Sequence, residues 1–315
     1  MHRRITKAFF AAAAAGATAT TLGLAASPAG AAVAGNYFSP SGGTPVPTNA
    51  QCIVTPLPSD NCGMSGYQAS GRDFRFASAV ITVPSHVGNS EEGTTPADPV
   101  LYVALDATSN TTYEYARVGL APCSDLDDFV VPGVTFTTAG LGSCPASGWV
   151  VFDAVYQPTT VPTVNVAPLS GSLLGDGVGV SVYLSSNGNQ VQTQITLPTG
   201  VVIQHVTPVT GPTYTKAQAF ADWTTAVEAG TTKPEPAVPA EKIRDSQFFQ
   251  GRFTTLNGVQ GTFNGPWTLT PYEATSNGTA PPAGTLIGEP SYLWNDGSGF
   301  HGMGSDAFGT WRFPF

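Results

Sequence analysis

Apolar and polar residues alternate along much of the chain at the two-residue interval that is typical of β-strands. Residues 100–105 form a short apolar run, and residues 113–118 alternate after a polar loop. Both segments predict strands. Because side chains alternate across a strand, Tyr113, Tyr115 and Arg117 should share one face of a sheet. We therefore expect a tyrosine-lined face that carries one guanidinium group.

Further along the chain, a second pair of alternating segments predicts a β-hairpin. Residues 178–184 and 190–197 alternate strongly, and the Asn187-Gly188 pair between them is typical of a type I′ turn. Residues 149–156 are apolar and aromatic on both faces, which suits a strand in the centre of a sheet.

The segment at residues 215–229 fits two structures. Thr215 and Gln218 have the spacing of a capping box, and several apolar residues recur at helical intervals. Gln218, Phe220 and Asp222 also alternate with alanines, as they would in a strand. Local propensity favours a helix, and the alternation leaves a strand open.

The composition favours an all-β protein. Only 10% of the 315 residues are charged, whereas Gly (36) and Pro (27) are abundant. Few charges, many turn formers and many β-branched residues are typical of a fold made of short strands. We divide the chain into four parts: a signal peptide (1–34), a Pro/Gly/Thr-rich segment (35–61), the main β-domain (62–270), and a Gly- and aromatic-rich C-terminal extension (271–315) that should pack on it.

The N-terminus has the features of a secretion signal. Three cations lie in residues 1–7, residues 8–26 are apolar and mostly small, and residues 32–34 form an A-x-A cleavage site. Removing residues 1–34 takes three of the 12 cations and none of the 21 acids, so the mature net charge is 9 − 21 = −12. We expect a secreted, acidic protein with no nucleic-acid partner and, after cleavage, no membrane association.

An exported chain with an even number of cysteines is expected to form disulfides. Three pairings of the four cysteines are possible, and closure of short loops favours Cys52–Cys62 and Cys123–Cys144. No C-x-x-C spacing or paired histidines suggest zinc, and no metal or cofactor is expected.

Motifs of familiar enzyme classes do not occur in the chain. The sequence contains no H-E-x-x-H, P-loop, dinucleotide fingerprint or G-x-S-x-G elbow. The mature chain has three widely spaced histidines, His86, His205 and His301, for which we expect structural roles.

Several short motifs, in this order, nevertheless form a pattern. They read SGYQA, YVALD, ARVG, LGDGV and AQAFAD, and they begin at residues 65, 102, 116, 174 and 217. In order and spacing they resemble the N-W-x-G-A, W-V-G-I-D, L-Q-x-G, G-D-x-I and A-E-W-I-V-E motifs of the glutamic peptidases, or eqolisins. That family consists of secreted acid endopeptidases with a lectin-like β-sandwich. The resemblance covers about residues 65–225.

The family's catalytic residues are replaced at the matching positions. Its Gln, which helps to stabilise the oxyanion, corresponds to Arg117, and its Glu, a general base, corresponds to Asp222. Tyr102 stands in place of a landmark Trp. Asp is shorter than Glu, and an arginine beside it would hold the carboxylate in an ion pair. We therefore predict a structural Arg117–Asp222 pair.

The resemblance implies an antiparallel β-sandwich of the lectin-like, concanavalin A-like jelly-roll type, with two packed sheets and a concave groove. It also implies a strand at residues 216–225. We expect the groove to bind a peptide or glycan without glutamic peptidase catalysis, through Tyr102, Tyr113, Tyr115 and Asp106. An active acid endopeptidase that uses Asp222 in an altered dyad, and a structural or surface-interaction protein, are the alternatives. The oligomeric state is not indicated by the sequence, and a monomer is the default.

Overall fold

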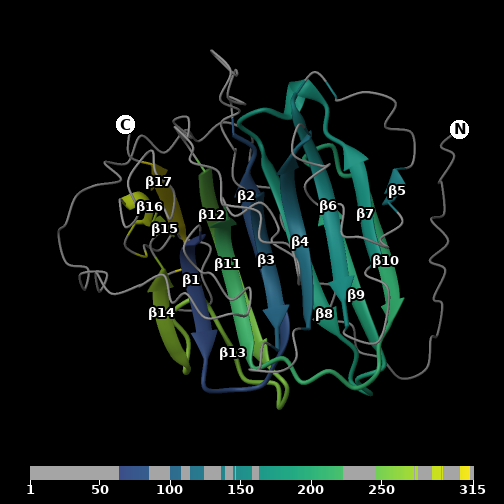
Figure 1. The fold of residues 1–315 in the computed structure, drawn as a ribbon, viewed down its shortest axis with the longest axis vertical. Helices are drawn as coiled ribbons and strands as arrows, with labels where there is room; N and C mark the ends of the chain where they lie inside the picture. The colour runs from purple at the N-terminus through teal and green to yellow at the C-terminus, as the bar shows by residue number, and fades with distance from the viewer. Residues whose placement is uncertain are drawn as a thin grey trace, which may run out of the picture.

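Two β-sheets packed face to face make up the fold (Figure 1). The computed structural model describes residues 64–84, 100–107, 114–123, 136–138, 145, 147–157, 163–222, 246–272, 274–275, 286–291, 293 and 306–312. The predicted all-β sandwich is confirmed for this part of the chain, in which no helix is long and apolar enough to cross a membrane. The predicted signal peptide and the segment at residues 35–61 lie outside the described residues.

The first sheet faces the viewer in Figure 1. Its strands lie in the order β14 (Thr268–Tyr272), β1 (Met64–Ser70), β11 (Lys216–Asp222), β3 (Val100–Asp106), β4 (Tyr115–Pro122), β6 (Trp149–Tyr156), β7 (Thr163–Pro168) and β5 (Phe136–Thr138). Neighbouring strands are antiparallel, with the exception of β5, which runs parallel to β7.

The second sheet lies behind the first. Its order is β10 (Val202–Pro208), β9 (Gln190–Thr196), β8 (Gly177–Leu184), β2 (Phe74–Thr82), β12 (Ser246–Thr255), β17 (Phe308–Arg312), β16 (Leu286–Pro290) and β15 (Ala274–Thr275), and β13 (Gln260–Gly261) pairs with β12. A short 3-10 helix, η3 (Gly171–Leu173), precedes β8. The C-terminal part of the chain thus supplies strands to both sheets, because β14 belongs to the first and β15 to β17 belong to the second.

An apolar layer between the sheets holds the sandwich together. Alternate residues of each strand are buried there, including Leu101, Val103 and Leu105 from β3 and Val178, Val180 and Val182 from β8. Fully buried side chains of this size each contribute roughly 1.5–3 kcal/mol through removal of apolar surface from water. The other face of the first sheet carries a second buried cluster, to which Val100, Tyr102 and Ala104 contribute. We call this face the outer face of the first sheet.

The predicted hairpin is formed by β8 and β9, but its turn differs from the prediction. The N–H of Ser185 donates to the carbonyl of Gln190 at 2.9 Å, and the N–H of Gln190 donates to Oγ of Ser185 at 3.1 Å. The loop is therefore longer than two residues. A type I′ turn requires positive φ at both central residues, and only Gly188 (φ 69°) has it, so the predicted turn type is wrong.

The ambiguous segment is a strand over Lys216–Asp222, and its remainder lies outside the described residues. β11 pairs with β1 on one side and with β3 on the other. Hydrogen bonds along both edges and burial of the alternating alanines outweigh the helical preference of the local sequence. The strand that the resemblance implied is confirmed for these residues.

Gly119 allows β3 and β4 to approach closely beside Tyr102. A Cβ atom at this position would overlap the carbonyl oxygen of Leu101 and lie 2.7 Å from the Cα atom of Tyr102. Because both obstacles are backbone atoms in a paired strand, they have little room to move. Glycine is thus required where the two strands bring Tyr102 and Arg117 together.

We predict that Gly119→Ala destabilises the protein by about 1–3 kcal/mol, the usual cost of overpacking a filled site. Urea denaturation measures this change. Gly200→Ala is a useful comparison, because a Cβ atom there meets nothing within 4 Å and only the φ of 82° is unfavourable. A Gly119→Ala variant as stable as the parent would contradict the argument.

Tyr214 is fully buried in the core, next to Phe74, and its hydroxyl group has no hydrogen-bond partner among the described residues. Burial raises the pKa of Tyr214 well above its ordinary value of 10.0, and the nearby carboxylates of Glu114 and Asp106 raise it further. The folded protein therefore retains this proton at a pH where the unfolded chain loses it.

We predict that stability falls as the pH rises above about 10, because the unfolded state releases the Tyr214 proton first. Tyr214→Phe should remove that part of the alkaline loss. At neutral pH the same variant should be neutral or slightly stabilising, since the unsatisfied hydroxyl group is removed. Urea denaturation at pH 7 and at pH 10–11 tests both statements. An unchanged alkaline slope in the variant would refute the assignment.

Candidate functional site

The register of the first sheet arranges the predicted site residues in rows across the outer face. Gln68, Gln218, Ala104 and Arg117 are successive neighbours from β1 through β11 and β3 to β4. In the next row, Tyr102 lies between Phe220 and Gly119. Asp222 lies one row further along β11, opposite Val100. The side chains of Arg117, Tyr102 and Asp222 thus project from the same face, as predicted.

Arg117 lies between two tyrosine rings. Its guanidinium carbon is 4.4 Å from the ring centroid of Tyr115 and 4.8 Å from that of Tyr102. Tyr115 is itself stacked on Tyr156, with ring centroids 5.6 Å apart. A cation over an aromatic face is attracted by the ring quadrupole. The two rings therefore hold the charged group in one orientation, with the side chain partly exposed and its Nε atom buried.

Tyr102 connects Arg117 to Asp222. The Tyr102 hydroxyl group donates a hydrogen bond to Oδ2 of Asp222 at 3.1 Å, and both side chains are buried. One aromatic residue thus contacts the cation with its ring and the carboxylate with its hydroxyl group. The direct Arg117–Asp222 ion pair stays a prediction.

Two glutamines next to this cluster form a hydrogen-bonded chain. Nε2 of Gln218 donates to Oε1 of Gln68 at 2.9 Å, and Nε2 of Gln68 donates to the hydroxyl oxygen of Tyr272 at 3.0 Å. Oε1 of Gln218 is buried and has no hydrogen-bond partner among the described residues. Burial raises the pKa of Tyr272 in spite of the Gln68 hydrogen bond, so its hydroxyl group stays protonated. The chain thus ends in a free acceptor at Gln218.

Other predicted site residues are placed less centrally. Asp106 is buried at the end of β3, where Oδ1 lies 3.9 Å from Nζ of Lys216. Tyr113 lies outside the described residues.

Cys123 takes part in a disulfide, and its N–H donates to the carbonyl of Gly148 at 2.7 Å. Cys52, Cys62 and Cys144 lie outside the described residues, so the pairing stays a prediction.

His205 belongs to a polar contact between the sheets. Its Nδ1 atom lies 2.5 Å from Oδ2 of Asp153, and Nδ2 of Asn165 donates to Oδ1 of the same carboxylate at 2.9 Å. Asp153 is buried on the inner face of β6, whereas the His205 side chain on β10 is 38% exposed. This arrangement ties the second sheet to the first and fits the structural role expected for His205.

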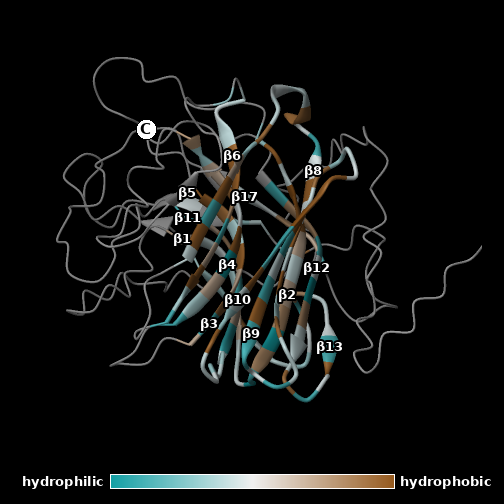
Figure 2. Cartoon of the chain, turned by 90° about the vertical axis from the view of Figure 1, so that its right-hand side faces the viewer, coloured by the Kyte–Doolittle hydropathy of each residue, from teal (hydrophilic) through white to brown (hydrophobic). Residues whose placement is uncertain are grey.

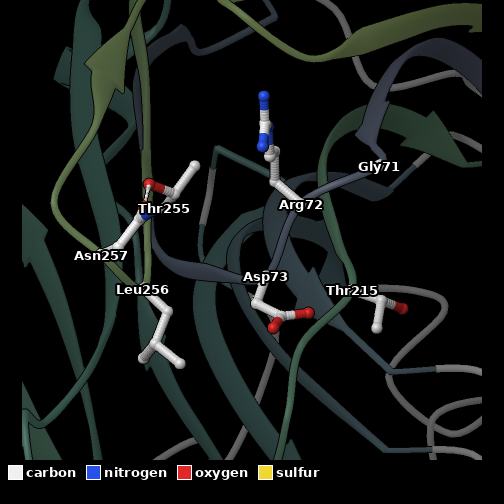
Figure 3. A pocket seen from close by; sticks show the side chains of 7 residues that line it. All are labelled: Gly71, Arg72, Asp73, Thr215, Thr255, Leu256 and Asn257. Carbon is white, nitrogen blue, oxygen red and sulfur yellow. Dashed lines mark hydrogen bonds between the residues drawn. The ribbon is translucent and has the colours of Figure 1, made fainter.

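A cavity of about 630 Å³ lies away from these residues, among turns of the chain (Figure 3). It is lined by Gly71, Arg72, Asp73, Thr215, Thr255, Leu256 and Asn257. Figure 3 shows the side chains of Arg72 and Asp73 extending in different directions. None of the predicted site residues lines this cavity, and its polar groups do not converge on one point. We therefore place the candidate site on the outer face of the first sheet.

Comparison of the sequence with protein-family models and with curated proteins found no match. The resemblance to the glutamic peptidases therefore depends on the short motifs and their order. The fold class agrees with that resemblance, but a β-sandwich is shared by many unrelated proteins.

Gln68, Gln218 and Tyr272 are the site residues that sequence reasoning missed. The alternation of residues 217–222 places Gln218 on the same face as Asp222, which is a usable signal. Gln68 and Tyr272 lie 204 residues apart, and only the pairing of β1 with β14 and β11 brings them together. A local pattern cannot indicate such a contact.

We predict that Tyr102→Phe destabilises the fold by about 1–3 kcal/mol, because Asp222 loses a donor in a buried environment. The ring over which Arg117 lies is retained. A double-mutant cycle with Asp222→Ala isolates the hydrogen bond, and urea denaturation gives each free energy of unfolding. Additive effects of the two substitutions would show that the hydrogen bond contributes nothing.

Proposed function

We propose that the protein is a secreted, eqolisin-like β-sandwich protein that binds an extended peptide on the outer face of the first sheet, without standard glutamic peptidase catalysis. The proposal depends chiefly on one observation. Where the resembling family has a neutral glutamine, this chain has a guanidinium group held between two tyrosine rings. A cation fixed in this way is suited to bind a carboxylate group of a ligand.

The surrounding groups support a peptide as the ligand. The amide oxygen of Gln218 has no hydrogen-bond partner among the described residues and could accept one from a peptide N–H, provided that the side chains covering it move. Phe220, Tyr102 and Tyr272 form an aromatic cluster, with ring centroids of Phe220 and Tyr272 5.4 Å apart. Because Tyr102 and Phe220 are almost fully buried, Tyr272 and the partly exposed Arg117 supply the accessible part of this cluster. A glycan is the alternative ligand, since flat aromatic rings also suit sugar faces.

The residues at the family's catalytic positions argue against standard catalysis. A general base must reach the proton of a bound water, and an aspartate side chain is one methylene shorter than the family's glutamate. The carboxylate of Asp222 already accepts a hydrogen bond from Tyr102. Arginine at the family's glutamine position cannot supply the neutral amide that the standard mechanism uses at the oxyanion.

The catalytic alternative is tested with a denatured protein substrate at pH 2–7. We expect no cleavage by the folded protein at any pH in this range. Acid cleavage that disappears in Asp222→Ala would overturn the proposal and establish an active peptidase with an altered dyad. Circular dichroism of each sample confirms that the protein is folded at the pH of the assay.

Binding is tested with peptides from a digest of a denatured protein and, separately, with neutral oligosaccharides. We expect retention of acidic peptides, with Arg117→Ala weakening it by about tenfold or more because a charge-assisted contact is lost. Arg75→Ala is the matched control: Arg75 also lies over a tyrosine, 4.8 Å from the ring centroid of Tyr183, but on the second sheet. Equal loss in both variants, or retention of oligosaccharides alone, would contradict a peptide site at Arg117.

A further inference from the structure

β10 is the edge strand of the second sheet, and no strand in the described part of the chain pairs with its outer edge. Figure 2 looks onto the side of the sandwich where this strand lies. The N–H of Leu197 donates to the carbonyl of Val201 at 2.8 Å, and the N–H of Val209 donates to the carbonyl of Asn189 at 2.9 Å. These two bonds show which residues of β10 direct their backbone N–H and C=O groups toward β9.

Hydrogen-bonded pairs recur at every second residue of an antiparallel ladder. In the observed register, Val201, Ile203 and His205 therefore direct their backbone groups toward β9. The backbone groups of Val202, Gln204 and Val206 point away from the sheet. The row of N–H groups that point away from the sheet ends at Pro208, which has no N–H to donate.

The free edge is apolar and uncharged. The side chains of Val202 and Val206 are 52% and 50% exposed, and Gln204 between them is also exposed. Residues 177–215 contain no Asp, Glu, Lys or Arg, although the whole chain carries 21 acidic residues and a net charge of −9. Proteins usually protect exposed edge strands with charges. No Asp, Glu, Lys or Arg of β8, β9 or β10 therefore adds like-charge repulsion between two copies at this edge.

We propose that β10 pairs with β10 of a second copy of this chain, antiparallel about a two-fold axis through Gln204. This register places Gln204 opposite Gln204 of the second copy, and Val202 opposite Val206 of the second copy. It uses all three free N–H groups. An axis through Val206 would pair Gln204 with a proline, and an axis through Val202 would extend into the β9–β10 turn.

A second copy suits this edge better than an unrelated peptide, because the pairing is self-complementary. Among the exposed side chains of β10, each valine meets a valine and the glutamine meets a glutamine. On the inner face, Ile203 would lie opposite His205 of the second copy. The contact of His205 with Asp153 holds β10 in place before it pairs, which lowers the entropic cost of association. The interface lies on the second sheet and is independent of the proposed peptide site.

Sedimentation velocity over a range of protein concentrations tests the dimer. We expect a reversible dimer whose Kd rises about tenfold or more in Val206→Lys, since a lysine is placed against the edge of the second copy. Ser181→Lys is the matched control, because it adds the same charge on β8, two strands from the edge. A protein that is monomeric at all concentrations, or equal effects of the two substitutions, would overturn the proposal.

Single cysteines test the register. In a hydrogen-bonded antiparallel pair the Cα atoms are about 5.5 Å apart, within the range of a disulfide. Gln204→Cys should therefore cross-link two copies under mild oxidation. Val202→Cys should not, because two copies of residue 202 would lie about 13 Å apart along the strands. Cross-linking that is as fast at position 202 as at position 204 would rule out the proposed axis.

Discussion

The apolar layer between the two sheets determines where every site residue lies. Since side chains alternate along each strand, burial of Leu101, Val103 and Leu105 toward the second sheet leaves Tyr102 and Ala104 on the outer face. The same constraint on β4 and β11 turns Arg117 and Asp222 to that face. A shift of register by one residue would exchange the two faces and would bury a guanidinium group in the core. The candidate site is thus a consequence of how the core is packed.

Close packing also limits the chemistry of the outer face. Gly119 brings the backbones of β3 and β4 together, so that the guanidinium group of Arg117 lies over the Tyr102 ring. The hydroxyl group of the same tyrosine donates a hydrogen bond to the Asp222 carboxylate. Charged groups that are oriented by neighbours bind a ligand without further loss of side-chain freedom.

Much of this arrangement follows from local sequence. A short apolar run predicts β3, and alternation predicts β4, the β8–β9 hairpin and the shared face of Tyr115 and Arg117. Local sequence cannot predict that β5 runs parallel to β7, nor that Gln68 meets Tyr272, because these features depend on which strands pair. Asp153 and His205 are 52 residues apart and lie in different sheets. The predicted type of the turn at Asn187 is wrong because the number of loop residues, and not the Asn-Gly pair, decides its geometry.

Tyr102 separates a cation from an anion by the width of one aromatic ring. Arg117 lies on the β4 side of this ring and Asp222 at its hydroxyl end on β11. The outer face therefore has an electrical polarity that runs across the strands. In the proposed peptide site, a linear ligand with unlike ends, such as a zwitterion, would meet attraction at both ends in one orientation and repulsion at both ends in the reverse orientation. Such a site would distinguish the direction of a chain as well as its composition.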